Sequence, residues 1–125
     1  WQILQHHEPD DFVLATGETH TVREFVEEVG RHLDMDIVWE GEGSEERGVD
    51  RKTGKTVVEI DPIHFRPSEV DLLLGDPTKA RTVLGWVPRV TFKELARIMT
   101  ENDFALVKEE ALLGKKFEVK HYPIA

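Results

Sequence analysis

Two Thr-x-x-Glu motifs predict where the two longest helices of this chain begin. In such a motif the threonine hydroxyl accepts a hydrogen bond from the third N–H of the helix, and the glutamate reaches back to the threonine N–H. Thr21 and Glu24 form the first motif, and an apolar stripe of helical spacing follows it through about residue 33. Thr91 and Glu94 form the second motif, before a longer apolar stripe. The sequence therefore predicts two amphipathic helices.

The C-terminal half carries further helix signals. We expect the second long helix to run toward Leu113 and to stop at Gly114. A shorter helix precedes it. Asp76 is its expected N-cap and Pro77 its expected first residue, and Gly85 is the expected stop.

Strands are few in this sequence. Residues 12–15 are a short apolar run that predicts a buried strand, and the β-branched and aromatic run 37–39 predicts a second. Residues 49–60 predict a hairpin, and residues 1–7 resemble the last turns of a helix whose beginning is missing. These strands are too few and too irregularly spaced for an independent doubly wound sheet. We expect an α/β region that belongs to a larger fold, with short strands, a hairpin and about three helices.

Composition excludes several classes of function. The 125 residues suffice for about one domain, and 16 basic against 25 acidic residues give a formal charge of −9. Nucleic-acid binding rests on basic residues, so we expect no nucleic-acid partner. The absence of cysteine excludes disulfides, thiol nucleophiles and cysteine-ligated zinc. No apolar run is long enough to span a bilayer and no signal-peptide pattern is present, so we expect a cytoplasmic protein without a membrane partner.

Glycine-rich motifs do not predict a cofactor site in this chain. Gly41 and Gly43 follow a predicted strand, but the next glycine is Gly48, so the dinucleotide fingerprint is incomplete. Glu45 and Glu46 lie between them and would repel a pyrophosphate. A solvated loop is the favoured interpretation.

Catalytic and metal-binding patterns are also incomplete. Ser44 follows a glycine but lacks the second glycine of a hydrolase elbow, and the only tyrosine, Tyr122, has no lysine four residues later. The acidic and histidine residues between positions 6 and 11 are consecutive and do not share one face. Polar residues that follow the end of a helix explain them better than a metal site does. We predict no catalytic residue and no metal ligand.

Arg66 and Glu69, separated by Pro67, are the candidate binding pair. An arginine fork can hold two phosphate oxygens, and a carboxylate can accept both hydroxyls of a ribose. Pro67 restricts Arg66 to an extended conformation, so the two side chains leave a stiffened segment. The alternative is a local Arg–Glu ion pair, and the spacing alone favours that alternative.

Several blocks of the chain occur in a recognisable order. They are the runs DDFVLATGE (10–18), TVREFVE (21–27), IVWEG (37–41), DP (61–62), FRPSEVDLLLGDPTKA (65–80) and LGW (84–86). With these blocks the chain resembles the GDP-mannose 4,6-dehydratase family, in order from Trp1 to about Asp103. The tail after Lys108 matches weakly, and Ile63 and His64 stand where an Arg/Lys–Tyr type of pair is common in the family.

The resemblance implies the C-terminal, substrate-binding region of an extended short-chain dehydrogenase/reductase with a Rossmann-type fold. Enzymes of this family use NADP to take a hydride from C4 of the mannosyl group of GDP-mannose. Water is then lost across C5–C6, and the hydride returns to C6 to give GDP-4-keto-6-deoxymannose. In the family the arginine of the Arg-Pro-x-Glu segment contacts the diphosphate and the glutamate contacts the ribose hydroxyls. The resemblance gives these roles to Arg66 and Glu69.

The resemblance also implies that parts of the enzyme lie upstream of Trp1. These are the NADP-binding glycines, the tyrosine–lysine pair and the acid–base residues, so this chain alone is expected to be inactive. We expect residues 1–114 to form the substrate-binding region and residues 115–125 a tail. GDP-mannose and the upstream Rossmann half are the expected partners, within a homodimer or homotetramer. The alternatives are another nucleotide-sugar epimerase or dehydratase, or a stand-alone acidic interaction module.

Overall fold

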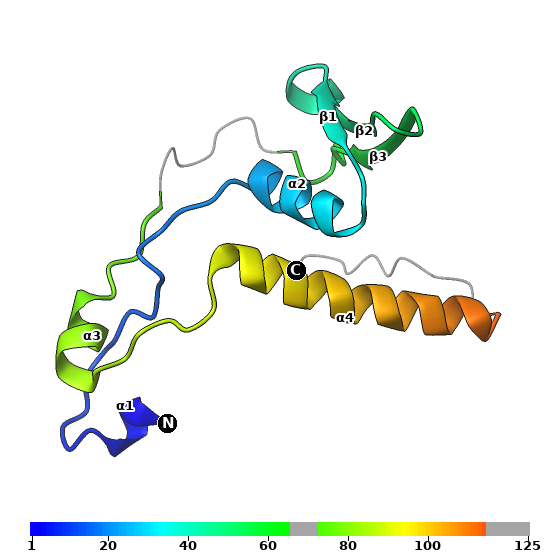
Figure 1. The fold of residues 1–125 in the computed structure, drawn as a ribbon. Coiled ribbons are helices and arrows are strands. Elements are labelled where there is room, and N and C mark those ends of the chain that lie inside the picture. The colour runs from blue at the N-terminus through cyan, green and yellow to red at the C-terminus, as the bar shows by residue number, and fades with distance from the viewer. Residues whose placement is uncertain (66–72, 115–125) are drawn as a thin grey trace.

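The computed structural model describes residues 1–65 and 73–114 of the chain (Figure 1). The described residues form four α-helices, one short 3₁₀ helix and three strands. In chain order they are α1 (Gln2–Gln5), α2 (Val22–His32), β1 (Ile37–Glu40), the 3₁₀ helix η1 (Gly43–Glu45), β2 (Arg47–Asp50), β3 (Lys55–Glu59), α3 (Thr78–Leu84) and α4 (Phe92–Leu112). This is the mixed α/β content that the sequence predicts.

The three strands form one small antiparallel sheet in the order β1-β2-β3. Val38 of β1 lies opposite Val49 of β2. In the β2–β3 pair, Gly48 faces Val58 and Val49 faces Thr56, so the register shifts between these positions. The predicted strand at 37–39 and the predicted hairpin are confirmed. β2 begins two residues earlier than expected, at Arg47.

Both predicted capping boxes are present. The Thr21 hydroxyl accepts from the Glu24 N–H at 3.1 Å, and Glu24 accepts from the Thr21 N–H at 2.7 Å. Thr91 and Glu94 make the same pair of bonds, at 3.3 and 2.9 Å. These reciprocal bonds satisfy N–H groups that the first turn of a helix leaves without partners. They begin α2 and α4 at the predicted residues.

The predicted helix after Asp76 is also present as α3. Gly85 ends it in the left-handed conformation at φ 63°, as expected. The helix begins one residue later than predicted, because Pro77 occupies the N-cap position instead of the first helical position. Asp76 nevertheless supports the first turn, since its carboxylate accepts from the Thr78 N–H at 2.9 Å.

The prediction of a buried strand at residues 12–15 is wrong. These residues have no strand assignment, and Val13 and Leu14 are 54% and 52% exposed. The segment instead runs beside the extended residues around Gly75, which its side chains contact. A strand exists only when a second strand completes its backbone hydrogen bonds, and the described residues supply none to this run. An apolar run alone does not contain that information.

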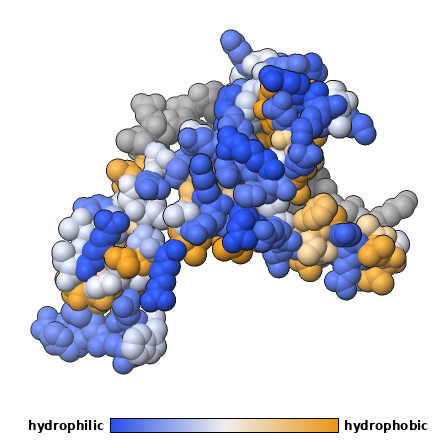
Figure 2. Space-filling model, viewed as in Figure 1, coloured by the Kyte–Doolittle hydropathy of each residue, from blue (hydrophilic) through white to orange (hydrophobic). Residues whose placement is uncertain are grey.

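The helices and the sheet enclose little core. α2 packs against α4, and β1 follows on the other side of α2 (Figure 1). Ala80 and Ala96 are the only buried hydrophobic residues among those described. Figure 2 shows apolar residues of α4 reaching the surface, and Leu95, Ile98 and Leu106 are each about half exposed. No helix in the described parts is both long and apolar enough to cross a membrane.

Candidate functional site

The predicted binding residues Arg66 and Glu69 lie outside the described residues. The structure does describe the chain on both sides of them, residues 61–65 and 73–77. The geometry of these two flanks is therefore what the structure contributes to the candidate site.

The upstream flank is a turn organised by Asp61. The Asp61 carbonyl accepts from the N–H groups of His64 and Phe65, at 3.0 and 3.1 Å. Its carboxylate accepts from the Ile63 N–H at 2.9 Å. An aspartate that accepts from the N–H two residues later stabilises a turn. Phe65, the residue directly before Arg66, is therefore held by a backbone hydrogen bond.

The downstream flank contacts the extended segment that follows residue 12. The Thr19 hydroxyl donates to the Leu73 carbonyl oxygen at 2.8 Å. A β-carbon placed on Gly75 would lie 2.6 Å from the Ala15 β-carbon and 3.5 Å from Val13 Cγ1. The two segments approach so closely that position 75 has no room for a side chain.

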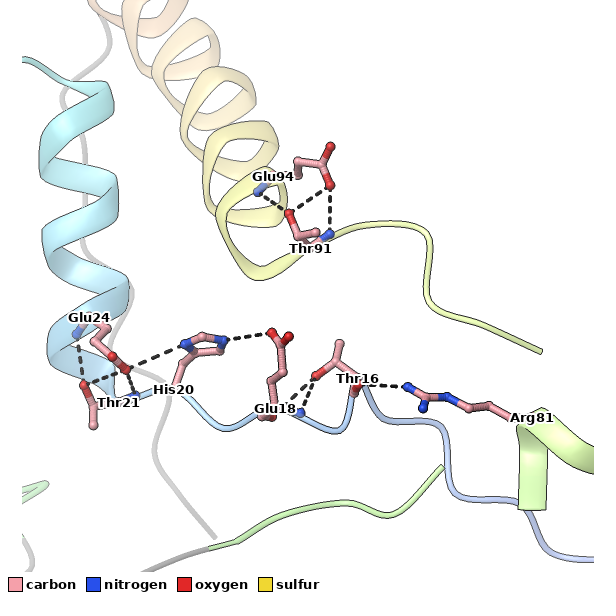
Figure 3. A network of polar contacts seen from close by, with 8 residues as sticks. All are labelled: Thr16, Glu18, His20, Thr21, Glu24, Arg81, Thr91 and Glu94. Atoms are coloured by element: carbon pink, nitrogen blue, oxygen red, sulfur yellow. Dashed lines mark hydrogen bonds and ion pairs between the residues drawn. The ribbon is translucent and has the colours of Figure 1, made fainter. Parts of the chain in front are cut away.

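A chain of polar contacts continues from this segment to the neighbouring helices (Figure 3). Arg81 of α3 donates to the Thr16 carbonyl at 3.2 Å, and the Thr16 hydroxyl accepts from the Glu18 N–H at 3.2 Å. His20 lies between two carboxylates, 3.4 Å from Glu18 and 3.7 Å from Glu24. The network therefore links α3 to the start of α2.

His20 also contacts the start of α4. Its ring stacks on Phe92, with centroids 3.8 Å apart and an interplanar angle of 10°. The sequence alone predicts only a surface or cap histidine at position 20, without a partner four residues later, and this prediction is wrong for the partner. One signal was available, since His20 and Glu24 have the i, i+4 spacing of an ion pair. The stack on Phe92 joins residues that no local pattern connects.

Hydrogen bonding lowers the pKa of several carboxyl groups in this region. The Thr21 N–H bond, with help from the Thr21 hydroxyl and His20, lowers the pKa of Glu24. The Thr91 N–H and hydroxyl lower the pKa of Glu94 in the same way. The Thr78 hydroxyl and N–H lower the pKa of Asp76. Each bond favours the charged form, so these side chains act as structural acceptors.

The glycine loop at 41–48 does not fit a dinucleotide. A β-carbon on Gly41 would lie 2.4 Å from the Glu45 carbonyl oxygen, so the chain folds back closely on itself at this glycine. The adjacent pocket, of about 570 Å³, is lined by several glutamates, and its arginine, Arg47, already bonds Glu40 at 2.9 Å. These groups would repel a pyrophosphate. No group of three metal-binding side chains occurs among the described residues, including those between positions 6 and 11.

The described residues define a mixed α/β region with a small antiparallel sheet and half-exposed apolar side chains on α4. Residues 1–99 match the family model described as GDP-mannose 4,6 dehydratase. The chain is 51% identical over 108 residues to a human protein named GDP-mannose 4,6 dehydratase, a match that covers 86% of this chain and 29% of that protein. It is 52% identical over 108 residues to GDP-mannose 4,6-dehydratase of Sinorhizobium fredii, covering 86% of this chain and 31% of that protein. A third relative, GDP-mannose 4,6 dehydratase of Drosophila melanogaster, is 49% identical over 112 residues, covering 90% of this chain and 28% of that protein.

The chain therefore belongs to the GDP-mannose 4,6 dehydratase family. It spans about 30% of the length of these curated relatives. The predicted resemblance is confirmed.

Proposed function

We propose that this chain is the C-terminal substrate-binding part of an NADP-dependent GDP-mannose 4,6-dehydratase, a lyase that converts GDP-mannose to GDP-4-keto-6-deoxymannose and water. The observation that carries the proposal is the family match over residues 1–99, with about half of the residues identical to dehydratases. In this proposal residues 1–114 form the substrate-binding region of an extended short-chain dehydrogenase/reductase. Residues 115–125 form a tail.

Arg66 and Glu69 are the proposed nucleotide contacts. Arg66 binds the diphosphate through paired, charge-assisted hydrogen bonds, and Glu69 accepts from the ribose hydroxyls. The chain carries a formal charge of −9, so a local cation is required to attract a diphosphate against the overall field. The described chain ends on the upstream side in a hydrogen-bonded turn, in which the Phe65 N–H donates to the Asp61 carbonyl.

The exposed apolar surface supports the second half of the proposal, that further protein completes the enzyme. Half-exposed leucine, isoleucine and phenylalanine side chains on α4 need a covering layer, because large apolar patches in contact with water favour association. In this proposal NADP is bound by a part of the enzyme outside this chain, as the family resemblance implies. That part also supplies the catalytic groups. The cytoplasmic location and the homodimeric or homotetrameric assembly stay predictions.

A chimera tests the proposal directly. This chain would replace the matching region of the Sinorhizobium fredii relative, and turnover of GDP-mannose would be measured with Arg66→Ala and the control Arg97→Ala. Arg97 bonds Glu101 on the surface of α4, at 2.8 Å. Hydrogen bonds to charged groups contribute about 1.5–3 kcal/mol, so Arg66→Ala is expected to raise KM or Kd for the substrate more than tenfold. The control is expected to change either constant less than twofold.

Two results would contradict the proposal. If the chimera is active and Arg66→Ala changes KM less than twofold, Arg66 does not contribute to binding of the diphosphate. A chimera that folds and binds NADP but does not turn over GDP-mannose contradicts the assignment of this chain to the substrate-binding region.

A further inference from the structure

We propose that residues 115–125, the C-terminal tail, bind in the apolar groove between α2 and α4. The structure describes every residue that lines this groove. The tail lies outside the described residues, so its binding is inferred from its sequence, its reach and its charge. The proposed contact involves neither Arg66 nor Glu69 and is independent of the substrate that the enzyme takes.

The groove lies where α2 passes beside the middle of α4 (Figure 1). It has a volume of about 390 Å³. Most of its wall is apolar, with Phe25, Val29 and Leu33 from α2 and Met99, Phe104 and Val107 from α4. The three α4 side chains are still about half exposed. Because α2 covers this face of α4 only in part, a further apolar layer would remove more of it from water.

The groove is centred on a different side of α4 from the exposed stripe of Leu95, Ile98 and Leu106. Thr100 is buried and lines the groove. Successive residues of an α-helix lie about 100° apart, so Ile98 points roughly 160° away from Thr100. An occupant of the groove therefore leaves this stripe free to contact further protein.

The tail starts within reach of the groove. Gly114 follows α4 in the left-handed conformation, at φ 66°, and such a residue turns the chain away from the helix axis. A helix rises about 1.5 Å per residue, so along α4 Val107 lies roughly 10 Å and Phe104 roughly 15 Å before Gly114. Extended chain rises roughly 3.3 Å per residue, so about three to five residues span these distances. Phe117 and Val119 can therefore reach this part of the groove.

The tail also has a residue pattern suited to an apolar groove. Phe117 and Val119 alternate with the charged residues Glu118 and Lys120. Alternate residues of an extended chain share one face, so this pattern can turn two apolar side chains toward the groove and two charges toward water. A buried aromatic side chain removes roughly 150–250 Å² from water, so Phe117 contributes most of the gain.

Charge favours the tail over a second copy of the chain as the occupant. α4 carries five acidic and three basic residues, and Asp103 of α4 lines the groove. The tail carries three lysines and one glutamate, so its charge is opposite to that of α4. A second copy, at a formal charge of −9, would instead bring like charges together.

The test is a disulfide cross-link in the full chain of 125 residues, which contains no cysteine of its own. Val107→Cys with Val119→Cys places one thiol in the groove and one in the tail. Lys108→Cys with Val119→Cys is the matched control, because it moves the first thiol by one residue and about 100° around the helix, away from the groove.

A disulfide forms only when the two Cα atoms come within about 7 Å, so the Val107 pair is expected to give an intramolecular disulfide in at least about threefold higher yield than the control. Mass spectrometry of proteolytic fragments after mild oxidation measures the yield. Equal yields would overturn the proposal, because the tail would then have no preference for the groove side of α4. A disulfide between two molecules, identified by mixing tagged and untagged chains, would also overturn it and would assign the groove to a second copy.

A second pair of variants covers the case in which Val107→Cys disturbs the packing of α2 on α4. Phe117→Ser with Val119→Ser changes only the tail, and Glu118→Ser with Lys120→Ser is its control, since it alters two neighbouring residues without changing the net charge. Binding of an apolar fluorescent dye is expected to rise at least about twofold in the first variant, as the groove is uncovered, and to stay near the parent level in the control. No rise in the first variant, with unchanged helix content by circular dichroism, would overturn the proposal.

Discussion

The imidazole of His20 lies nearly parallel to the ring of Phe92, 3.8 Å away, and joins the beginnings of α2 and α4. Phe92 is the first residue of α4, and His20 lies one residue before the N-cap of α2. Phe25 of α2 meets the same ring edge-on at 6.2 Å. The α2–α4 contact therefore depends on aromatic packing at one end.

Removing the ring of His20 is expected to loosen this contact. Aromatic pairs contribute about 1 kcal/mol beyond the area they bury, so His20→Ala should lower the free energy of unfolding by about that amount. Urea unfolding at neutral pH measures this change in the free energy of unfolding. His32→Ala is the control, because His32 pairs with Glu28 on α2 and has no aromatic partner among the described residues. Equal losses in the two variants would contradict a special role for the stack.

The two capping boxes predict a loss of stability in acid. Their hydrogen bonds give Glu24 and Glu94 a lower pKa in the folded state than in the unfolded state. The folded protein then binds fewer protons, so this stabilisation is complete above the ordinary glutamate pKa and is lost as the pH falls through the lowered values. We expect the melting temperature to fall below about pH 4.3.

The double variant Glu24→Gln with Glu94→Gln tests this origin. The double variant should have a lower melting temperature than the parent at neutral pH. Its melting temperature should also fall less steeply than that of the parent as the pH is lowered. Melting curves from about pH 3 to pH 7 give both quantities. If the melting temperature of the double variant falls with decreasing pH as steeply as that of the parent, other carboxyl groups cause the loss of stability in acid.

Among the carboxylates of the sheet, Asp50 is the one whose removal is expected to lower the melting temperature most. It is only 4% exposed and accepts from the Asp36 N–H at 3.0 Å, the Lys52 N–H at 3.3 Å and the Thr53 hydroxyl at 2.7 Å. The bonds hold the β2–β3 turn and the start of β1 together. The Thr53 hydroxyl and the Asp36 N–H lower the pKa of Asp50.

Asp50→Ala should lower the melting temperature by several degrees, because three donors lose their acceptor. Asp36→Ala is the matched control. Its side chain is about half exposed and pairs with Arg51 at 3.5 Å, which predicts a small effect. Thermal unfolding followed by circular dichroism compares the two variants. An equal or larger loss in Asp36→Ala would contradict the expectation that the Asp50 carboxylate holds this part of the sheet together.

The isolated chain is expected to self-associate and to unfold without a sharp transition. Leu95, Ile98 and Leu106 recur with helical spacing on α4 and are 48%, 46% and 54% exposed. Burying such a stripe against another molecule is favourable. Sedimentation velocity at several concentrations should therefore show oligomers, and a monomer with a sharp two-state transition would contradict the expectation.

Charges placed on this stripe should reverse the association. Ile98→Lys with Leu106→Lys is expected to shift the chain toward monomer with little loss of helix. Glu101→Lys, on the polar side of α4 where Glu101 bonds Arg97, is the control and should leave the association in place. Equal effects of the two changes would mean that net charge, and not the apolar stripe, controls association.

Features decided by neighbouring residues were predicted correctly. The two capping boxes, the stop at Gly85 and the hairpin depend on atoms within a few positions of one another. Their hydrogen bonds form wherever the local chain adopts the right conformation, so residue type and spacing are sufficient signals.

Features that need a distant partner were missed or predicted wrongly. Residues 12–15 carry a strand-like pattern, but the described residues provide no strand to complete it. The proposed nucleotide pair, Arg66 and Glu69, came from a motif and a family resemblance, and it stays a prediction. The Thr19 bond to Leu73 crosses 54 positions and leaves no mark in either local sequence.

The sequence by itself determined the starts and stops of the helices, the hairpin and the family to which the chain belongs. Only the tertiary structure decided that His20 packs on Phe92, that Thr19 holds Leu73, and that little apolar surface is buried within the described residues. The physical reason is the distance along the chain between the residues that interact. Hydrogen bonds within a turn are set by covalent connection, whereas burial and long-range contacts depend on which surfaces meet when the whole chain folds.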